Sequence, residues 1–570
     1  ASHTSSSICS VCQLVGKSGL FNTDHSQWIP RDRNALIKYA KMWRDAKTVK
    51  ERKNIFNKYG VRWTSFSLLD YWDPTRQLVI DSMHCILEGL VQYQCRHVLR
   101  LDASTRQSSS TGFKYAFDWQ WPLYDADTAP IHIEMNPKHI PQVAKVQDVL
   151  CWAIEGEQSV SLDYMWSRLG GQVLSALQFV AWSLELPLSL DNIDRQISSL
   201  YIERSNRNQP HNSSEFIAET GDEATLKFIQ NVIRDMIRPA WVSSVPKNFG
   251  EKSAGSVKAE EWRWLSSLFL PVALIIYWGD ADGCAPPEDD SKEGRFLKVL
   301  DHTMALFQAT IVALLYSTST RRANIYRKYH AEWVNGLTTL FPQAREGKIK
   351  PNIHAAGHIF DFLLLFGPVM SWWCFPFERL IGALQKINTN DHIGGEMEAT
   401  IIKSVIRTSN IRRWLGRPDC PEAVRQLKVM FDRCFKPVNG MVNQENRPSR
   451  GSTRAHAKWD STNFSRSKTH PGNATIIYRP SPDEKPIAGV IQEIRNDTNS
   501  PTIKLQVRPF ESLPNHLYDP FSRFPHLSAK TYSSTLREEP DEIALDAIVS
   551  HAARYDYTHN RSVLVNLCRD

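Results

Sequence analysis

The sequence predicts a mixed, mainly α protein that ends in a small antiparallel β-barrel. Apolar residues recur with helical spacing through most of the first 435 residues, and short β-branched runs bounded by Pro, Asn and Asp follow residue 473. With 570 residues, of which 42% are apolar and 23% charged, the chain has a globular composition and enough length for a large core.

The first part of the chain predicts a series of helices. Residues 33–60 show helical spacing with a stop at Gly60, and residues 81–99 form a second apolar helix with Asp81 in the N-cap position. Further helices are expected over about 143–184, 296–317 and 321–340. The apolar stretch Trp264–Trp278 is shorter than the roughly 18–20 residues that a membrane span requires, so it predicts a buried helix and no membrane partner.

The last hundred residues predict strands instead. The runs ATIIYRP, IAGVIQEIRN, TIKLQVRPF and SVLVNLC are short and β-branched, and RNDTNSPT has the composition of a hairpin turn. We therefore expect a β-barrel domain over residues 473–570.

Positive charge is concentrated in residues 401–470, which hold 15 Lys and Arg against 5 Asp and Glu in a chain of net charge +7. Such a segment suits a polyanion, although a solvated linker has the same composition. The candidate DNA-binding side chains are Arg412, Arg413, Arg447, Arg450, Arg454, Lys458, Arg466 and Lys468.

Ten cysteines in so long a chain do not indicate a disulfide scaffold. The C-x-x-C pair Cys9 and Cys12 is either half of a metal site or a redox motif, and its polar surroundings lack the βαβ pattern that a redox motif requires. His354 and His358 lie four residues apart, so on a helix they point the same way. Two core histidines would show this spacing too, but with the cysteines they complete a Cys₂His₂ set suited to a structural zinc ion.

Four segments together resemble the CACTA-type DDE transposases, in particular the fungal Plavaka branch. They are YGVRWTSFSLLDYWDPTRQLVIDSMHCILEGLVQ, KAEEWRWLSSLFLPVALIIYW, HAAGHIFDFLLLFGPVMSWWCFPFERLIGAL and RRWLGRPDCP. The resemblance implies the remnant of an RNase H-like core with a large all-α insertion, in which three carboxylates hold two Mg²⁺ ions for attack on a DNA phosphate.

The resemblance also assigns roles to single residues. Glu378 matches the last catalytic carboxylate, Asp81 and His84 match a D-x-x-H motif, and the split zinc site is a feature of a related recombinase. Without the resemblance, Asp81 would be read as a helix cap and Glu378 as an acid favoured by a helix dipole.

These inferences divide the chain into five parts. We expect the end of a truncated core with the C-x-x-C over 1–30, the insertion with D-x-x-H over 31–350, closing helices with the histidine pair and Glu378 over 351–440, a basic linker over 441–472, and the barrel over 473–570.

The expected function is cut-and-paste DNA transposition by a nuclear protein that binds double-stranded transposon ends, with a homo-oligomer left open. The first carboxylate is Asp24, so we expect the chain to be N-terminally truncated, to lack the first two catalytic aspartates and to be inactive, with Mg²⁺ bound only by a complete core. The alternative is a non-catalytic nuclear scaffold, derived from a transposase, that binds DNA through the basic segment and chromatin through the barrel.

Overall fold

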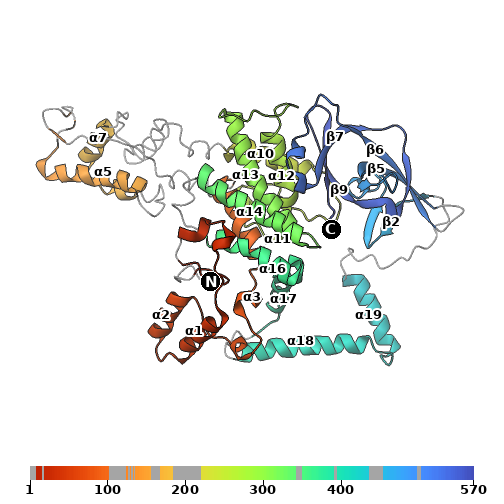
Figure 1. Ribbon diagram of the computed structural model, residues 1–570, viewed down its shortest axis with the longest axis horizontal. Coiled ribbons are helices and arrows are strands. Elements are labelled where there is room, and N and C mark those ends of the chain that lie inside the picture. The colour runs from red at the N-terminus through yellow and green to blue at the C-terminus, as the bar shows by residue number, and fades with distance from the viewer. Residues whose placement is uncertain are drawn as a thin grey trace.

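The computed structural model describes most of the chain. The described residues are 8–15, 18–101, 124–125, 129, 133, 135–155, 167–183, 220–341, 350–389, 395–435, 453–496 and 502–569. They form a helical body, two groups of helices that project from it (residues 33–77 and 375–435) and a C-terminal β domain (Figure 1). The mixed, mainly helical class predicted from the sequence is confirmed at this level.

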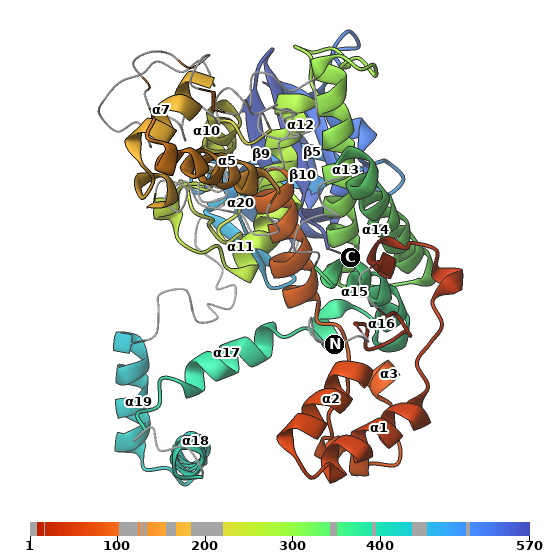
Figure 2. The same cartoon turned by 90° about the vertical axis from the view of Figure 1, so that its left-hand side faces the viewer.

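The N-terminal helices hang from one end of the body (Figure 2). Thr48 caps α2 by accepting a hydrogen bond from Glu51, which breaks the predicted 33–60 segment into two helices. Gly60 ends α2 with φ of 69°, a left-handed conformation that glycine adopts without steric cost. The elements are η1 (Ser18–Phe21), η2 (His25–Gln27), α1 (Arg33–Asp45), α2 (Val49–Tyr59), η3 (Ser65–Leu68) and α3 (Pro74–Gln77).

The helical body is built around two long antiparallel neighbours, α13 and α14, which make extensive contact. Its elements are η4 (Met83–Val91), η5 (Gln94–Val98), α10 (Glu223–Asp235), η7 (Lys252–Ala254), α11 (Ala259–Trp264), η8 (Leu265–Phe269), α12 (Leu270–Trp278), α13 (Lys292–Ala313), α14 (Thr320–Leu340), α15 (Asn352–Ala355), η10 (Ala356–His358), α16 (Ile359–Phe366) and η11 (Val369–Ser371). A smaller helical unit of η6 (Pro137–His139), α5 (Ile140–Glu155) and α7 (Leu174–Ser183) has an apolar cluster of its own and lies apart from the body in Figure 1.

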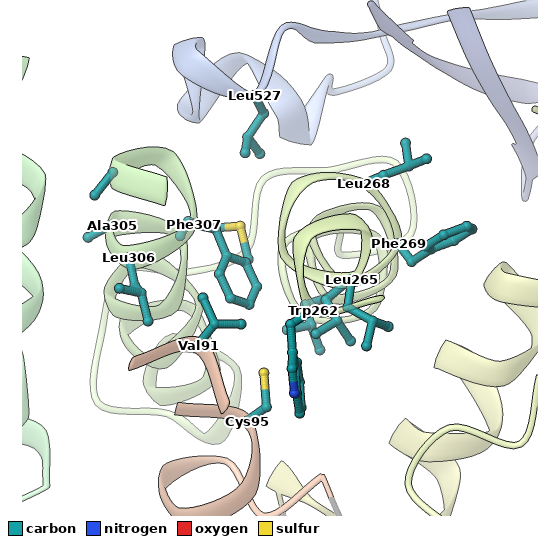
Figure 3. Packing of buried hydrophobic residues seen from close by; sticks show 14 of the residues in the cluster. Val91, Cys95, Trp262, Leu265, Leu268, Phe269, Ala305, Leu306, Phe307 and Leu527 are labelled. Carbon is teal, nitrogen blue, oxygen red and sulfur yellow. The ribbon is translucent and has the colours of Figure 1, made fainter. Parts of the chain in front are cut away.

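The predicted buried helix at Trp264–Trp278 is confirmed, since nearly all of η8 and α12 is inaccessible to solvent. Figure 3 shows Trp262 and Phe307 beside Val91 of η4 and Cys95 of η5, with Phe269 on the other side of its helix. All five belong to one continuous apolar cluster. Helix α13 is long and apolar enough to cross a membrane, and 78% of its apolar window is buried inside the protein. Burial of this kind accounts for its apolar composition by packing in the core.

Three further helices extend from the body. The helix α17 (Phe375–Leu384) leads away from it to α18 (Glu396–Leu415) and α19 (Glu422–Phe435), as Figures 1 and 2 show. Neither α17 nor α18 has a fully buried side chain. We call α17, α18 and α19 together the helical arm.

The β domain is an antiparallel sheet. Hydrogen-bonded neighbours run from β5 through β4, β9, β10, β7 and β6, and β6 pairs again with β5. Its elements are β1 (Thr453–Arg454), β2 (His456–Trp459), β3 (Thr462–Ser465), α20 (Pro471–Ala474), β4 (Thr475–Tyr478), β5 (Ile487–Asn496), β6 (Ile503–Ser512), η12 (Pro520–Arg523), η13 (Pro525–Leu527), β7 (Ala529–Leu536), β8 (Asp541–Ala544), η14 (Leu545–Ala547), β9 (Ile548–Tyr557) and β10 (Arg561–Asn566).

The β domain packs directly on the helical body. Leu527 reaches toward α13 in Figure 3 and belongs to the same apolar cluster as the helices. The guanidinium of Arg561 is fully buried and pairs with Asp280 at 2.6 Å, and Arg523 binds both carboxylate oxygens of Asp301. Part of the β domain therefore shares the apolar core of the helices, and a second cluster, which includes Ile476, Ile491 and Leu505, lies within the β domain itself.

One expectation needs correction. Residues 453–472 were expected in the basic linker, but they form β1, β2, β3 and the start of α20, and Ala457 pairs with Phe464 as buried neighbours. Burial of the cross-strand pair Ala457 and Phe464 stabilises this basic hairpin against the rest of the β domain. The named strands of the described residues all lie between 453 and 566, so an RNase H-like core is not shown.

Candidate functional site

The structure brings together the four predicted ligands Cys9, Cys12, His354 and His358 in one buried cluster, with their ligand atoms within 4.8 Å of one another. Cys12 Sγ lies 3.1 Å from His354 Nε2, and His354 Nε2 lies 3.3 Å from His358 Nε2. Two nitrogen ligands of a tetrahedral zinc ion, each about 2.0–2.1 Å from it, lie about 3.3 Å apart. The donor atoms therefore suit a four-coordinate metal ion.

Local structure aims these donors at one point. The C-x-x-C segment turns back so that Cys9 Sγ accepts hydrogen bonds from the backbone N–H groups of Val11 and Cys12. The histidines lie on the continuous helical path of α15 and η10, where a spacing of four residues places them on one face. Cys12 lies opposite Pro30 in a β-bridge, in which Gln13 N–H donates to the Ile29 carbonyl oxygen and Arg31 N–H donates to that of Val11.

Trp28 closes the cluster from one side. Its ring contacts both imidazoles, with ring centroids 4.4 Å from His354 and 4.6 Å from His358. Gly357, between the histidines, makes this approach possible, because a Cβ there would lie 2.4 Å from the Trp28 ring. Trp28 therefore covers one side of the cluster, and Gly357 leaves the space that its ring occupies.

Groups around the cluster orient its ligands. His358 Nδ1 forms a 2.9 Å hydrogen bond with Asp361, which directs His358 Nε2 into the cluster, and carboxylate partners of this kind are typical of metal-binding histidines. Arg31 donates to the Cys9 carbonyl oxygen and to that of Tyr59, which ties the cysteine loop to the N-terminal helices.

The metal-free cluster holds protons that a cation would displace. The hydrogen bond from Cys12, with those from the histidines, lowers the pKa of Cys9, while the neighbouring Cys9 raises the pKa of Cys12. Burial opposes charge on His358, but Asp361 and Cys9 together raise its pKa to about 9. A divalent cation with two thiolates and two neutral imidazoles would be neutral overall, which suits the buried position of all four residues.

A second cluster joins Asp81, His84 and Glu378, the residues singled out by the family resemblance. Asp81 Oδ2 lies 2.7 Å from His84 Nδ1 and accepts the His84 backbone N–H, so the expected N-cap role of Asp81 is confirmed. His84 Nε2 lies 3.7 Å from Glu378 Oε1. Glu378 is in the first turn of α17, where the helix dipole favours an acid.

Cys374 belongs to the same cluster and was not among the predicted site residues. Its backbone N–H donates to Asp81 Oδ1 at 2.7 Å, and its ligand atom lies within 4.8 Å of those of Asp81 and His84. Burial and the Asp81 carboxylate raise the pKa of the Cys374 thiol to about 11. Cys374 precedes α17 by one residue and comes near Asp81 only in the folded chain, so no local sequence pattern indicated it.

The predicted DNA-binding residues do not form one segment. Arg412 and Arg413 are exposed on α18, and Lys458 and Lys468 are exposed in the β domain. Arg454 and Arg466 lie half-buried beside the β2–β3 hairpin, whereas Arg447 and Arg450 fall outside the described residues. The basic side chains therefore lie on two elements, the helical arm and the β domain.

Comparison of the chain with known protein families, with curated proteins and with solved structures finds no match.

Proposed function

We propose that this chain is a transposase-related DNA-binding protein of the CACTA type, in which the Cys9, Cys12, His354 and His358 cluster holds a structural zinc ion. The observation that carries the proposal is the meeting of two ligand pairs that are 342 residues apart, which is the arrangement implied by the family resemblance. Four protein ligands in a closed, buried site are typical of structural zinc, and thiolate ligands favour zinc over Mg²⁺ or Ca²⁺.

The second element of the proposal is a catalytic role for Glu378. Its carboxylate is 51% exposed and its neighbour His84 is 52% exposed, so a DNA phosphate has access to both side chains. In a complete RNase H-like core, Glu378 would be one of three carboxylates holding the Mg²⁺ ions that polarise a phosphate and activate a nucleophile. Strand cleavage would therefore need two further carboxylates beside Glu378, and we assign residues 8–30 and 351–435 to a remnant of that core.

The third element is DNA binding. Exposed arginines on α18 and exposed lysines in the β domain offer positive charge to the phosphates of a duplex. We interpret the closed order of strands in the β domain as a small barrel that contributes part of this surface. With double-stranded DNA as the partner, the proposed location is the nucleus and the proposal includes no membrane contact. The proposal does not specify whether the protein acts as a monomer or as a homo-oligomer.

Salt dependence of duplex binding tests the proposal. For the full chain, the slope of log Kd against log salt concentration is expected to be about 0.9 for each phosphate that the protein neutralises. Replacing Arg412 and Arg413 by Gln should weaken binding and reduce this slope. The matched control is Lys50→Gln with Lys53→Gln, which removes the same charge from the exposed face of α2. Equal effects of the two double changes, or a binding affinity that does not respond to salt, would contradict the proposal.

A second function, a non-catalytic DNA-binding scaffold, is favoured by one observation: the described side chains predicted to bind DNA lie on α18 and in the β domain, and none of them is on α17 with Glu378. Cleavage of a labelled duplex in Mg²⁺ distinguishes the two, provided that the protein tested also carries the two further carboxylates that a complete core requires. Cleavage by that protein which disappears in Glu378→Gln while duplex affinity is unchanged supports the enzyme, and binding without cleavage in both proteins supports the scaffold.

A further inference from the structure

Asp81, His84 and Cys374 offer an oxygen, a nitrogen and a sulfur donor within 4.8 Å of one another, at a place separate from the Cys₂His₂ cluster. The three come from two segments far apart in sequence, the start of η4 and the residue before α17. Helix capping accounts for the contact between Asp81 and the His84 backbone, but it does not account for the position of the Cys374 thiol beside them.

The Asp81 carboxylate is fixed before any ligand binds. Its Oδ1 accepts the backbone N–H of Cys374 at 2.7 Å, and its Oδ2 accepts the backbone N–H of His84 at 2.8 Å. Its side chain is only 12% exposed. Both segments therefore hold the carboxylate in one orientation, beside the His84 ring and the Cys374 thiol.

The imidazole of His84 is held from both ends. His84 Nδ1 lies 2.7 Å from Asp81 Oδ2, and Nε2 lies 3.7 Å from Glu378 Oε1. A metal ion bound at Nδ1 would leave the Nε2–H directed at a carboxylate, and this outer partner is the one that metal-binding histidines commonly have.

We propose that Asp81, His84 and Cys374 form a second metal site, with Glu378 positioning His84 from the outer shell. The donor set of thiolate, imidazole and carboxylate selects a borderline divalent ion of the Zn²⁺ or Co²⁺ class over Mg²⁺. Three protein ligands, with His84 half-exposed, leave a coordination position open to water or to a phosphate oxygen, whereas the Cys₂His₂ cluster is closed. The inference goes beyond the proposed function, because metal binding here requires neither DNA nor strand cleavage.

Titration of the metal-free full chain with Co²⁺ tests the site, since cobalt–thiolate bonds give charge-transfer absorbance. The chain is expected to bind a second ion after the first, with added thiolate absorbance. Cys374→Ser should remove that added absorbance and weaken the second ion. Glu378→Gln should weaken it by roughly 10–100-fold, the usual effect of an outer-shell change, with the absorbance retained. Cys284→Ser is the matched control, because it removes an exposed thiol that is not in the cluster.

Retention of the first ion by each variant shows that it has folded, and His84→Ala gives an independent removal of the site. Saturation at one ion in the unaltered chain, or a Cys374→Ser spectrum identical to that of Cys284→Ser, would overturn the inference. The readouts contain no DNA, so failure of duplex binding or cleavage would count against the proposed function and leave the metal site standing.

Discussion

Cys12 Sγ lies 3.1 Å from His354 Nε2, although 342 residues separate the two in sequence. A contact of this kind fastens the N-terminal loop to the helical body at the beginning of α15. Metal binding at this point would couple to folding, because the ligand pairs meet only when the chain is folded.

The titration of His358 predicts a pH dependence of the metal-free protein. Its pKa is raised from 6.5 to about 9, so protonated His358 stabilises the folded state, fully below pH 6.5, and the contribution is lost as pH rises through 9. The loss amounts to at most about 3 kcal/mol. Thermal unfolding of chelator-treated protein should show Tm falling across this window, and the fall should be absent in His358→Gln. An equal fall in both proteins would assign it to other groups.

Metal affinity should change with pH in the opposite sense. His358 must lose its proton to bind a cation, so affinity should rise with pH toward 9 and each binding event should release protons. Isothermal titration calorimetry with Zn²⁺ in buffers of different ionisation enthalpy measures the protons released. Binding that is independent of pH would show that His358 is not a ligand.

Gly357 predicts a packing effect at the same site. In Gly357→Ala the new Cβ would lie 2.4 Å from the Trp28 ring, so Trp28 must move away from the histidines. Overpacking of this kind costs about 1–3 kcal/mol, and we expect a lower Tm and faster loss of bound zinc to a chelator. The control is Gly382→Ala on α17, where a Cβ meets nothing within 4 Å and helix propensity favours alanine by about 1 kcal/mol. The same loss in both variants would refute the steric argument.

The buried pair Asp280 and Arg561 predicts how strongly the β domain depends on the helical body. Their side chains are 4% and 0% exposed, so Asp280→Asn leaves a buried guanidinium without its counter-charge. The expected cost is about 3–5 kcal/mol. Asp419→Asn breaks the exposed pair with Arg417 and should cost about 1 kcal/mol or less. Limited proteolysis and Tm check the difference, and equal stability of the two variants would contradict the docking described above.

Local sequence patterns predicted the elements better than their assembly. Gly60 as a helix stop, Asp81 as a cap and the burial of Trp264–Trp278 all follow from short-range chemistry, and the structure confirms them. The Cys₂His₂ set was predictable because its two ligand pairs each have a recognisable spacing.

Features that depend on distant partners were missed. Cys374 appeared as a single cysteine beside aromatic residues, and only folding brings it to Asp81. The hairpin of β2 and β3 was assigned to a linker because its basic composition hides the pairing of Ala457 with Phe464. The burial of Arg561 depends on Asp280, which is 281 residues away, and no local pattern shows such a pair.

The most direct test of the central claim is X-ray absorption at the zinc edge of the Cys374→Ser protein loaded with one equivalent of zinc. A Cys9, Cys12, His354 and His358 site predicts two sulfur ligands at about 2.3 Å and two nitrogen ligands at about 2.0–2.1 Å. The same protein carrying Cys9→Ser and Cys12→Ser should lose the sulfur shell. Zinc bound by nitrogen and oxygen alone before those changes, or a sulfur shell that persists after them, would contradict the account.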